Sequence, residues 1–230
     1  MDGPGALRVD HADGGLGPRG RARGAAVGAH SVISSLGPTF LRRPRGAEWL
    51  ADAVRVLVVA GVPTAAIGWG PVDLAIAMLA LLGAVVARAL GLRPAVDVAV
   101  SVLSSLAAWS STLGWYTSAP GWDKVVHVVL VGLLAVVLCV VASDLGVLHD
   151  VRSLPVPADV AVGGVAGLAI GGVWEMGEWV GHTFVDATIF VGYDDTIGDL
   201  LADLVGGLAA GAALRWAAGD RRTRTAPRQR

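Results

Sequence analysis

The chain has little charge, a single cysteine and a single lysine. Only 16% of its 230 residues are charged, whereas soluble domains carry roughly a quarter. Cys139 is the only cysteine, so an intramolecular disulfide is excluded. Hydrophobic residues make up 54% of the chain and the mean hydropathy is +0.62. These values exclude an ordinary soluble domain and predict a polytopic membrane protein.

Long apolar stretches predict the membrane-spanning segments, because a helix needs about 20 residues to cross a bilayer. The stretches cover residues 48–68, 72–91, 95–114, 122–143, 158–181 and 196–217. We therefore predict an all-α fold, a bundle of about six transmembrane helices over residues 47–217. Residues 1–46 lack apolar periodicity and predict a disordered basic tail. Residues 218–230 form a second basic tail.

The distribution of arginine along the chain predicts how the spans are oriented in the membrane. Arginines occur in the N-terminal tail, in the turn between the second and third spans, between the fourth and fifth spans, and in the C-terminal tail. Because loops rich in Arg and Lys face the cytoplasm, we expect both termini to be cytoplasmic. The bias toward Arg, with 17 of the 18 basic residues, indicates a bacterial genome rich in GC and hence a multi-pass inner-membrane protein. The lipid bilayer is then its main partner, and we expect no nucleic-acid partner.

Glycines recur at every fourth position of the fifth span, at Gly163, Gly167 and Gly171. Gly207 and Gly211 have the same spacing in the sixth span. In a membrane this spacing favours close approach of two helix backbones. We therefore expect the last two spans to pack tightly.

Ionisable residues gather at one end of the last three spans. The candidates are Asp123, Lys124 and His127 on the fourth span, Glu175, Glu178 and His182 on the fifth, and Asp195, Asp199 and Asp203 on the sixth. Steps of three or four residues place each set on one helix face. The opposite halves of the spans show no comparable cluster. We therefore expect one polar, outward-facing site between spans four, five and six.

Several of these residues also have a structural interpretation. Asp123 and Asp195 begin helices, where a carboxylate caps free amides and complements the helix dipole. Thr196 followed by Asp199 resembles a capping box with Asp in place of Glu. For Asp123 and Asp195 we weigh the capping and functional interpretations equally.

The other candidates differ in their expected depth in the membrane. Lys124 and His182 are expected near the headgroup region, where a polar side chain is solvated. Glu175 and Asp203 lie one to two turns inside their spans. An ionisable group at membrane depth costs roughly 2.5 kcal/mol or more, so a function is favoured for these two carboxylates.

The residue types admit two chemistries. Carboxylates with histidine can bind a divalent metal ion: oxygen ligands suit Mg²⁺, Ca²⁺ or Mn²⁺, and His with carboxylates also allows Zn²⁺. The candidate metal ligands are His127, Glu175, Glu178, Asp195, Asp199 and Asp203. Alternatively, packed carboxylates share or relay protons, with Glu175, Glu178, His127 and Lys124 as candidate catalytic residues. Nucleotide-loop and nucleophile-elbow motifs are absent, so no organic cofactor is expected.

The motifs on the last three spans resemble those of the uncharacterised YjdF-like family of bacterial inner-membrane proteins. The matching stretches are DKVVHVVLVG, EMGEW and DTIGD, the last followed by Gly206 and Gly207. Their order is also similar to that of VanZ-like proteins, which are linked to glycopeptide resistance and envelope functions. His182 matches no part of the pattern. The resemblance implies a membrane protein but brings no established reaction.

Three functions follow from these observations and stay open. The site could bind a cation or a polar envelope ligand, which we favour. It could belong to a metal-dependent or acid–base enzyme acting on a lipid-linked or envelope substrate. It could also belong to a proton- or cation-coupled transporter.

Overall fold

Helices form all the regular structure of the computed structural model within the residues that it describes, 34–148 and 155–218. They are α2 (Glu48–Gly68), α3 (Pro71–Ala89), α4 (Pro94–Thr112), α5 (Trp115–Ser118), α6 (Trp122–Val126), the π-helical segment η1 (His127–Val131), α7 (Gly132–Asp144), α8 (Val156–Phe184) and α9 (Tyr193–Ala218). Since α6, η1 and α7 follow one another without a break, the described residues include six helices long and apolar enough to cross a membrane. The predicted all-α bundle is confirmed.

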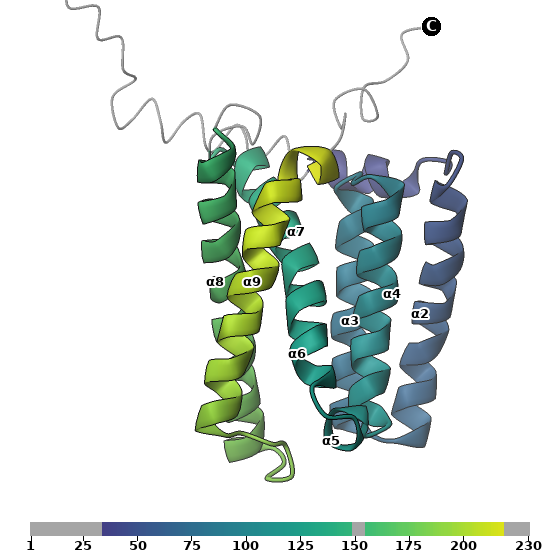
Figure 1. Cartoon of the computed structure of the whole chain (residues 1–230). Helices are drawn as coiled ribbons and strands as arrows, with labels where there is room; N and C mark the ends of the chain where they lie inside the picture. The colour runs from purple at the N-terminus through teal and green to yellow at the C-terminus, as the bar shows by residue number, and fades with distance from the viewer. Residues whose placement is uncertain (1–33, 149–154, 219–230) are drawn as a thin grey trace, which may run out of the picture.

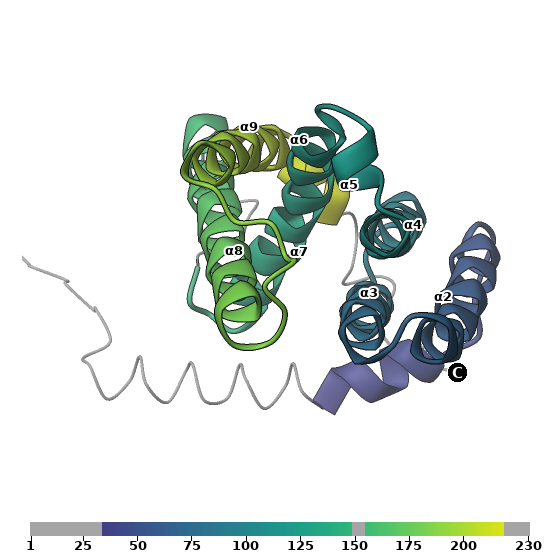
Figure 2. The same cartoon turned by 90° about the horizontal axis from the view of Figure 1, so that it is seen from below.

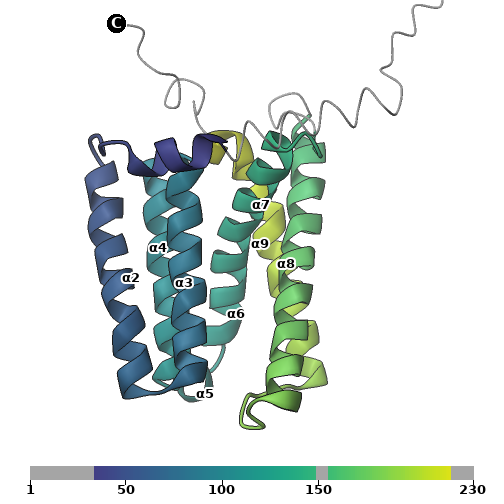
Figure 3. The ribbon, with the colours of Figure 1, turned by 180° about the vertical axis from the view of Figure 1, so that it is seen from behind.

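The helices extend beyond some of the predicted spans. α8 continues to Phe184 and α9 begins at Tyr193, so both reach three residues further toward the loop that joins them. Residues 34–41, inside the predicted tail, are helical and lie across one end of the bundle (Figures 1 and 3). Residues 1–33 and 219–230 of the two predicted tails lie outside the described residues.

The bundle has two groups of helices. Figure 2 shows α2, α3 and α4 on one side and α6 to α9 on the other. At one end, which we call the arginine end, α2, α4 and α8 begin; at the other, the carboxylate end, α6 and α9 begin (Figure 1). One apolar cluster joins the two groups, with Val96 and Val100 of α4, Cys139 and Val140 of α7, and Leu214 of α9 all buried.

Glycine determines how closely α8 and α9 approach. A Cβ on Gly163 would collide with the backbone of Gly207 and Gly211, and a Cβ on Gly167 would collide with the Asp203 carbonyl. The predicted close packing of these helices is therefore present. A Cβ on Gly171 would collide with the Asp203 carboxylate. The same glycine face thus positions an ionisable side chain.

Candidate functional site

The centre of the carboxylate end is the start of η1. His127 opens this π-helical turn, which continues to Val131. Gly206 of α9 lies against it, since a Cβ there would collide with the Val128 carbonyl oxygen. A Cβ on Gly132 would in turn come within 2.8 Å of the Gly206 carbonyl. Short π-helical turns often occur at functional sites, and this one places His127 directly beside α9.

Lys124 lies among three carboxylates. Its Nζ is 2.7 Å from Asp199 Oδ1, 2.8 Å from Asp195 Oδ1 and 3.3 Å from Asp123 Oδ2. The contact with Asp199 is an ion pair without hydrogen-bond geometry, because Asp199 Oδ1 is buried and has no hydrogen-bond partner within the described residues. The Lys124 side chain is 36% exposed, so its ammonium can also reach solvent.

His127 bridges the same carboxylates from the inside. Its Nδ1 is 3.0 Å from Asp203 Oδ1, and the Asp203 side chain is fully buried. Its Nε2 faces the other way, 3.7 Å from Asp123 Oδ1 and 3.8 Å from Asp199 Oδ1. When Nδ1–H donates to Asp203, the lone pair of the neutral ring is on Nε2 and points at the two carboxylates.

One group of ligand atoms has the dimensions of a metal site. Single ligand atoms of Asp123, His127 and Asp199 all lie within 4.8 Å of one another. Two ligands of one Zn²⁺ ion can be at most about 4.4 Å apart, twice the metal–ligand distance. The two separations from Nε2, 3.7 and 3.8 Å, are inside that limit. His127 and either aspartate are thus close enough to contact one cation, and all three ligand atoms lie within 4.8 Å of one another.

The residues predicted on α8 do not join this group. Glu178 accepts a hydrogen bond of 2.9 Å from Trp174 Nε1 on its own helix. Glu175 Oε1 is buried without a hydrogen-bond partner among the described residues. His182 lies inside α8, and its Nδ1 is 2.6 Å from the Ile189 carbonyl oxygen. The imidazole of His182 therefore ties the α8–α9 loop to the end of α8, away from the cluster.

Asp123 and Glu178 both act electrostatically on Tyr116 of α5. Burial raises the pKa of the Tyr116 hydroxyl, and the negative charges of Asp123 and Glu178 raise it further. The hydroxyl thus stays neutral and donates a hydrogen bond of 3.1 Å to the Ala107 carbonyl.

The capping interpretation of the carboxylates fails in part. The residue before α6 is Gly121, and no side chain caps that helix. α9 begins at Tyr193, so Thr196 lies inside the helix and cannot begin a capping box. Asp195 lies in the first turn of α9, where it complements the dipole while also contacting Lys124.

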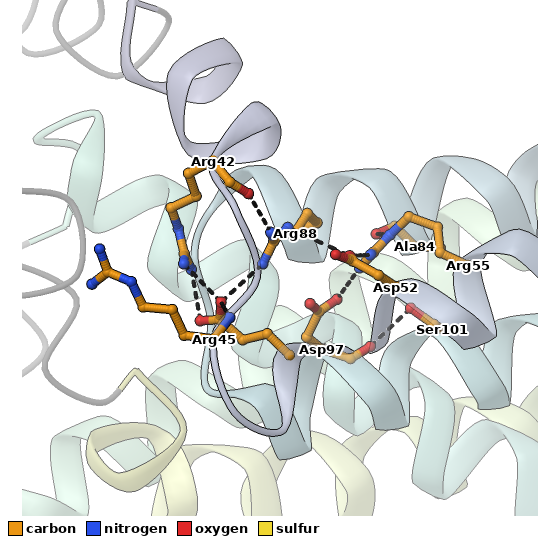
Figure 4. A network of polar contacts seen from close by, with 9 residues as sticks. Arg42, Arg45, Asp52, Arg55, Ala84, Arg88, Asp97 and Ser101 are labelled. Atoms are coloured by element: carbon orange, nitrogen blue, oxygen red, sulfur yellow. Dashed lines mark hydrogen bonds and ion pairs between the residues drawn. The ribbon is translucent and has the colours of Figure 1, made fainter. Parts of the chain in front are cut away.

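The expectation that the opposite half of the bundle carries no comparable cluster is wrong. At the arginine end, charged side chains from residue 42 and helices α2, α3 and α4 form one connected network (Figure 4). Asp97 and Arg88 are each 3% exposed, and Arg55 is 6% exposed. These charges therefore lie inside the protein.

Each arginine of this network bridges different segments. Arg55 donates to the Ala84 carbonyl at 3.0 Å and to Asp97 at 2.6 Å, and it also contacts Asp52 of its own helix. Arg88 donates to Glu48 at 3.3 Å and to the Arg42 carbonyl at 2.9 Å.

The Arg42 side chain holds Glu48 through two bonds of 2.7 Å. Asp52 and Arg55 are three residues apart on one helix, and this spacing was the sequence signal that could have indicated the network. Glu48 is on the same helix, whereas Arg88 and Asp97 come from α3 and α4 and Arg42 precedes α2.

The fold and the two charged ends define a polytopic helical membrane protein with ionisable groups inside its bundle. The family described as predicted membrane protein (DUF2238) matches residues 49–220. The chain belongs to this family, which is the one that the YjdF-like resemblance indicated. No curated protein and no solved structure matches the chain. The resemblance to VanZ-like proteins has no support from these comparisons.

Proposed function

We propose that the carboxylate end binds a divalent cation, with Asp123, His127 and Asp199 as its protein ligands. The observation that carries the proposal is the clustering of their ligand atoms within 4.8 Å. In the orientation expected from the arginines, this end faces away from the bacterial cytoplasm, so the cation would come from outside the inner membrane.

The environment of His127 supports a metal rather than a simple ion-pair cluster. Histidines that bind metals usually donate their other ring N–H to a carboxylate or carbonyl, which orients the ring. Asp203 is in that position, 3.0 Å from Nδ1 and fully buried. Its second oxygen, Oδ2, is also buried and has no hydrogen-bond partner within the described residues.

The balance of charge also favours a cation. Four carboxylates, those of Asp123, Asp195, Asp199 and Asp203, surround the single ammonium of Lys124 and the imidazole of His127. Buried carboxylates of one sign are costly unless they are neutralised by positive charge. An imidazole among carboxylates suits Zn²⁺ or Mn²⁺ better than Mg²⁺ or Ca²⁺.

The Lys124 ammonium would compete with a metal ion for Asp199. This ammonium contacts the Asp199 oxygen that a metal would need. Because the lysine side chain is partly exposed, it can turn toward solvent and Asp195 when a dication binds. We therefore expect a metal ion to displace the Lys124 ammonium from Asp199 when it binds.

Calorimetric titration of the purified protein in detergent with Zn²⁺ and with Mn²⁺ tests the proposal. We expect one saturable site, and Asp199→Asn to weaken it at least tenfold because one charged ligand is lost. His182→Gln is the matched control, since His182 is bound to a loop carbonyl outside the cluster. An Asp199→Asn protein that unfolds like the wild type and binds both metals with unchanged affinity would refute the proposal.

A cation-coupled transporter is a second candidate, and one contact favours it. α8 and α9 also carry an ion pair at the arginine end, where Arg215 Nε is 2.9 Å from Oδ2 of the buried Asp159. Ionisable groups thus occur at both ends of the same helix pair. Uptake of ⁶⁵Zn²⁺ or ⁵⁴Mn²⁺ into proteoliposomes under an imposed proton gradient tests this function, and the absence of flux in both directions would exclude it for these ions.

A further inference from the structure

The carboxylates at the arginine end are already occupied by a subset of its arginines. Glu48 pairs with Arg42 and Arg88, Asp52 and Asp97 pair with Arg55, and Asp159 pairs with Arg215. Within residues 34–148 and 155–218, Arg43, Arg45 and Arg93 form no ion pair. In the described part of this end, three guanidinium groups therefore have no carboxylate partner.

Two of these groups are on a segment held rigidly against the bundle. The backbone N–H of Arg45 donates a bond of 3.0 Å to Glu48 Oε2, and the Arg42 side chain holds the same carboxylate. Figure 4 shows the Arg45 side chain extending away from the network that its backbone joins. Arg43 and Arg45 are both exposed. The segment thus presents two charges at a defined place without the entropy loss of ordering a free tail.

Large apolar side chains accompany these charges. Leu41, two residues before Arg43, is 81% exposed, and Trp49, four residues after Arg45, is 64% exposed. The helix over residues 34–41 lies across the end of the bundle instead of along it (Figures 1 and 2). An interfacial segment with exposed Trp and Leu beside arginines is typical of the boundary between headgroups and acyl chains.

The third guanidinium group, that of Arg93, is next to an exposed tryptophan. Arg93, in the turn between α3 and α4, lies with its Cζ 5.5 Å from the centre of the Trp216 ring on α9. Trp216 is 56% exposed, so its indole can reach the interface while stacking with the arginine. Arg93 Nε is buried and has no hydrogen-bond partner among the described residues.

We propose that Arg43, Arg45 and Arg93 bind headgroups of anionic phospholipids at the arginine end. The phosphates would accept hydrogen bonds from the guanidinium groups, which suit them through their paired N–H donors. The acyl chains would lie against Leu41 and Trp49 beside Arg43 and Arg45, and against Trp216 beside Arg93. A soluble phosphate could not use these apolar side chains. The site is at the opposite end from the proposed cation site, so either proposal can fail without the other.

Binding of a fluorescent phosphatidylglycerol to the purified protein in a neutral detergent tests this inference. A basic residue near an anionic lipid contributes roughly a fivefold gain in affinity. Replacing Arg43 and Arg45 together by Gln should therefore weaken binding roughly 25-fold, and Arg93→Gln should weaken it roughly fivefold. The double replacement by Lys is the matched variant: it keeps the charge and should retain most of the affinity.

The competitors distinguish the possible occupants. Unlabelled phosphatidylglycerol should displace the probe, whereas phosphatidylcholine and inorganic phosphate at the same concentration should not. Equal displacement by phosphatidylcholine, or unchanged affinity in the Arg43→Gln, Arg45→Gln double variant, would overturn the proposal. Displacement by inorganic phosphate as effective as that by the lipid would also overturn it, in favour of a soluble anion. The double variant should unfold at the wild-type temperature, because both side chains are exposed and unpaired.

Discussion

A methyl group at Gly171 should damage both the packing of α8 on α9 and the geometry around His127. The Cβ of Gly171→Ala would collide with the Asp203 carboxylate. Asp203 has no free space to move into, because it is fully buried and bonded to His127 at 3.0 Å. Inserting a methyl group into a packed interior costs about 1–3 kcal/mol, and losing a hydrogen bond to a charged group costs about 1.5–3 kcal/mol more. We therefore expect the free energy of unfolding to fall by about 2.5–6 kcal/mol.

The neighbouring position provides the matched control. A Cβ on Gly172 would meet no atom within 4 Å. Gly172→Ala should leave the stability unchanged or raise it by up to about 1 kcal/mol, through the better helix propensity of alanine. Both variants are compared by thermal and denaturant unfolding in the same detergent. If Gly171→Ala is as stable as Gly172→Ala, the glycine face does not position Asp203 and the reasoning is refuted.

Four further outcomes are expected. Arg55→Met leaves Asp97 buried without its 2.6 Å ion pair and should cost about 3–5 kcal/mol of unfolding free energy; an equal loss in Arg43→Met would contradict this. Asp203→Asn should weaken Zn²⁺ binding about 10- to 100-fold, as replacing a residue that orients a metal-binding histidine usually does, and an unchanged titration would remove Asp203 from the site. Lys124→Met should tighten Zn²⁺ binding, since the ammonium 2.7 Å from Asp199 no longer competes, and weaker binding would show that the lysine supports the site instead. Zn²⁺ affinity should fall as the pH is lowered, because protons compete for histidine and carboxylate ligands; a titration that does not change with pH would exclude these ligands.

The helix spacing singled out the residues of the candidate site but not how the helices that carry them meet. Asp123 and His127 were placed on one face by their four-residue step, and Asp199 and Asp203 on another. The sequence could not show that η1 is π-helical, nor that Gly206 approaches the Val128 carbonyl there. That approach brings the two faces together.

The residues on α8 show what helix spacing leaves open. Glu175 and Glu178 have the same spacing logic as the other candidates, yet Glu178 binds Trp174 of its own helix. Periodicity shows which side chains share a face, but the rotation of that face about the helix axis is set by packing. On α8 this rotation follows the glycines that contact α9.

The sequence by itself determined the class of protein, because bilayer thickness converts apolar length directly into a number of spans. It also determined that α8 and α9 pack closely, since only glycine allows backbones to approach so near. Only the tertiary structure decided that Arg55 reaches Asp97 and that His127 reaches Asp203, on pairs of helices far apart in the chain. Such pairs follow from how neighbouring helices are rotated and staggered, which depends on the packing of all the helices together.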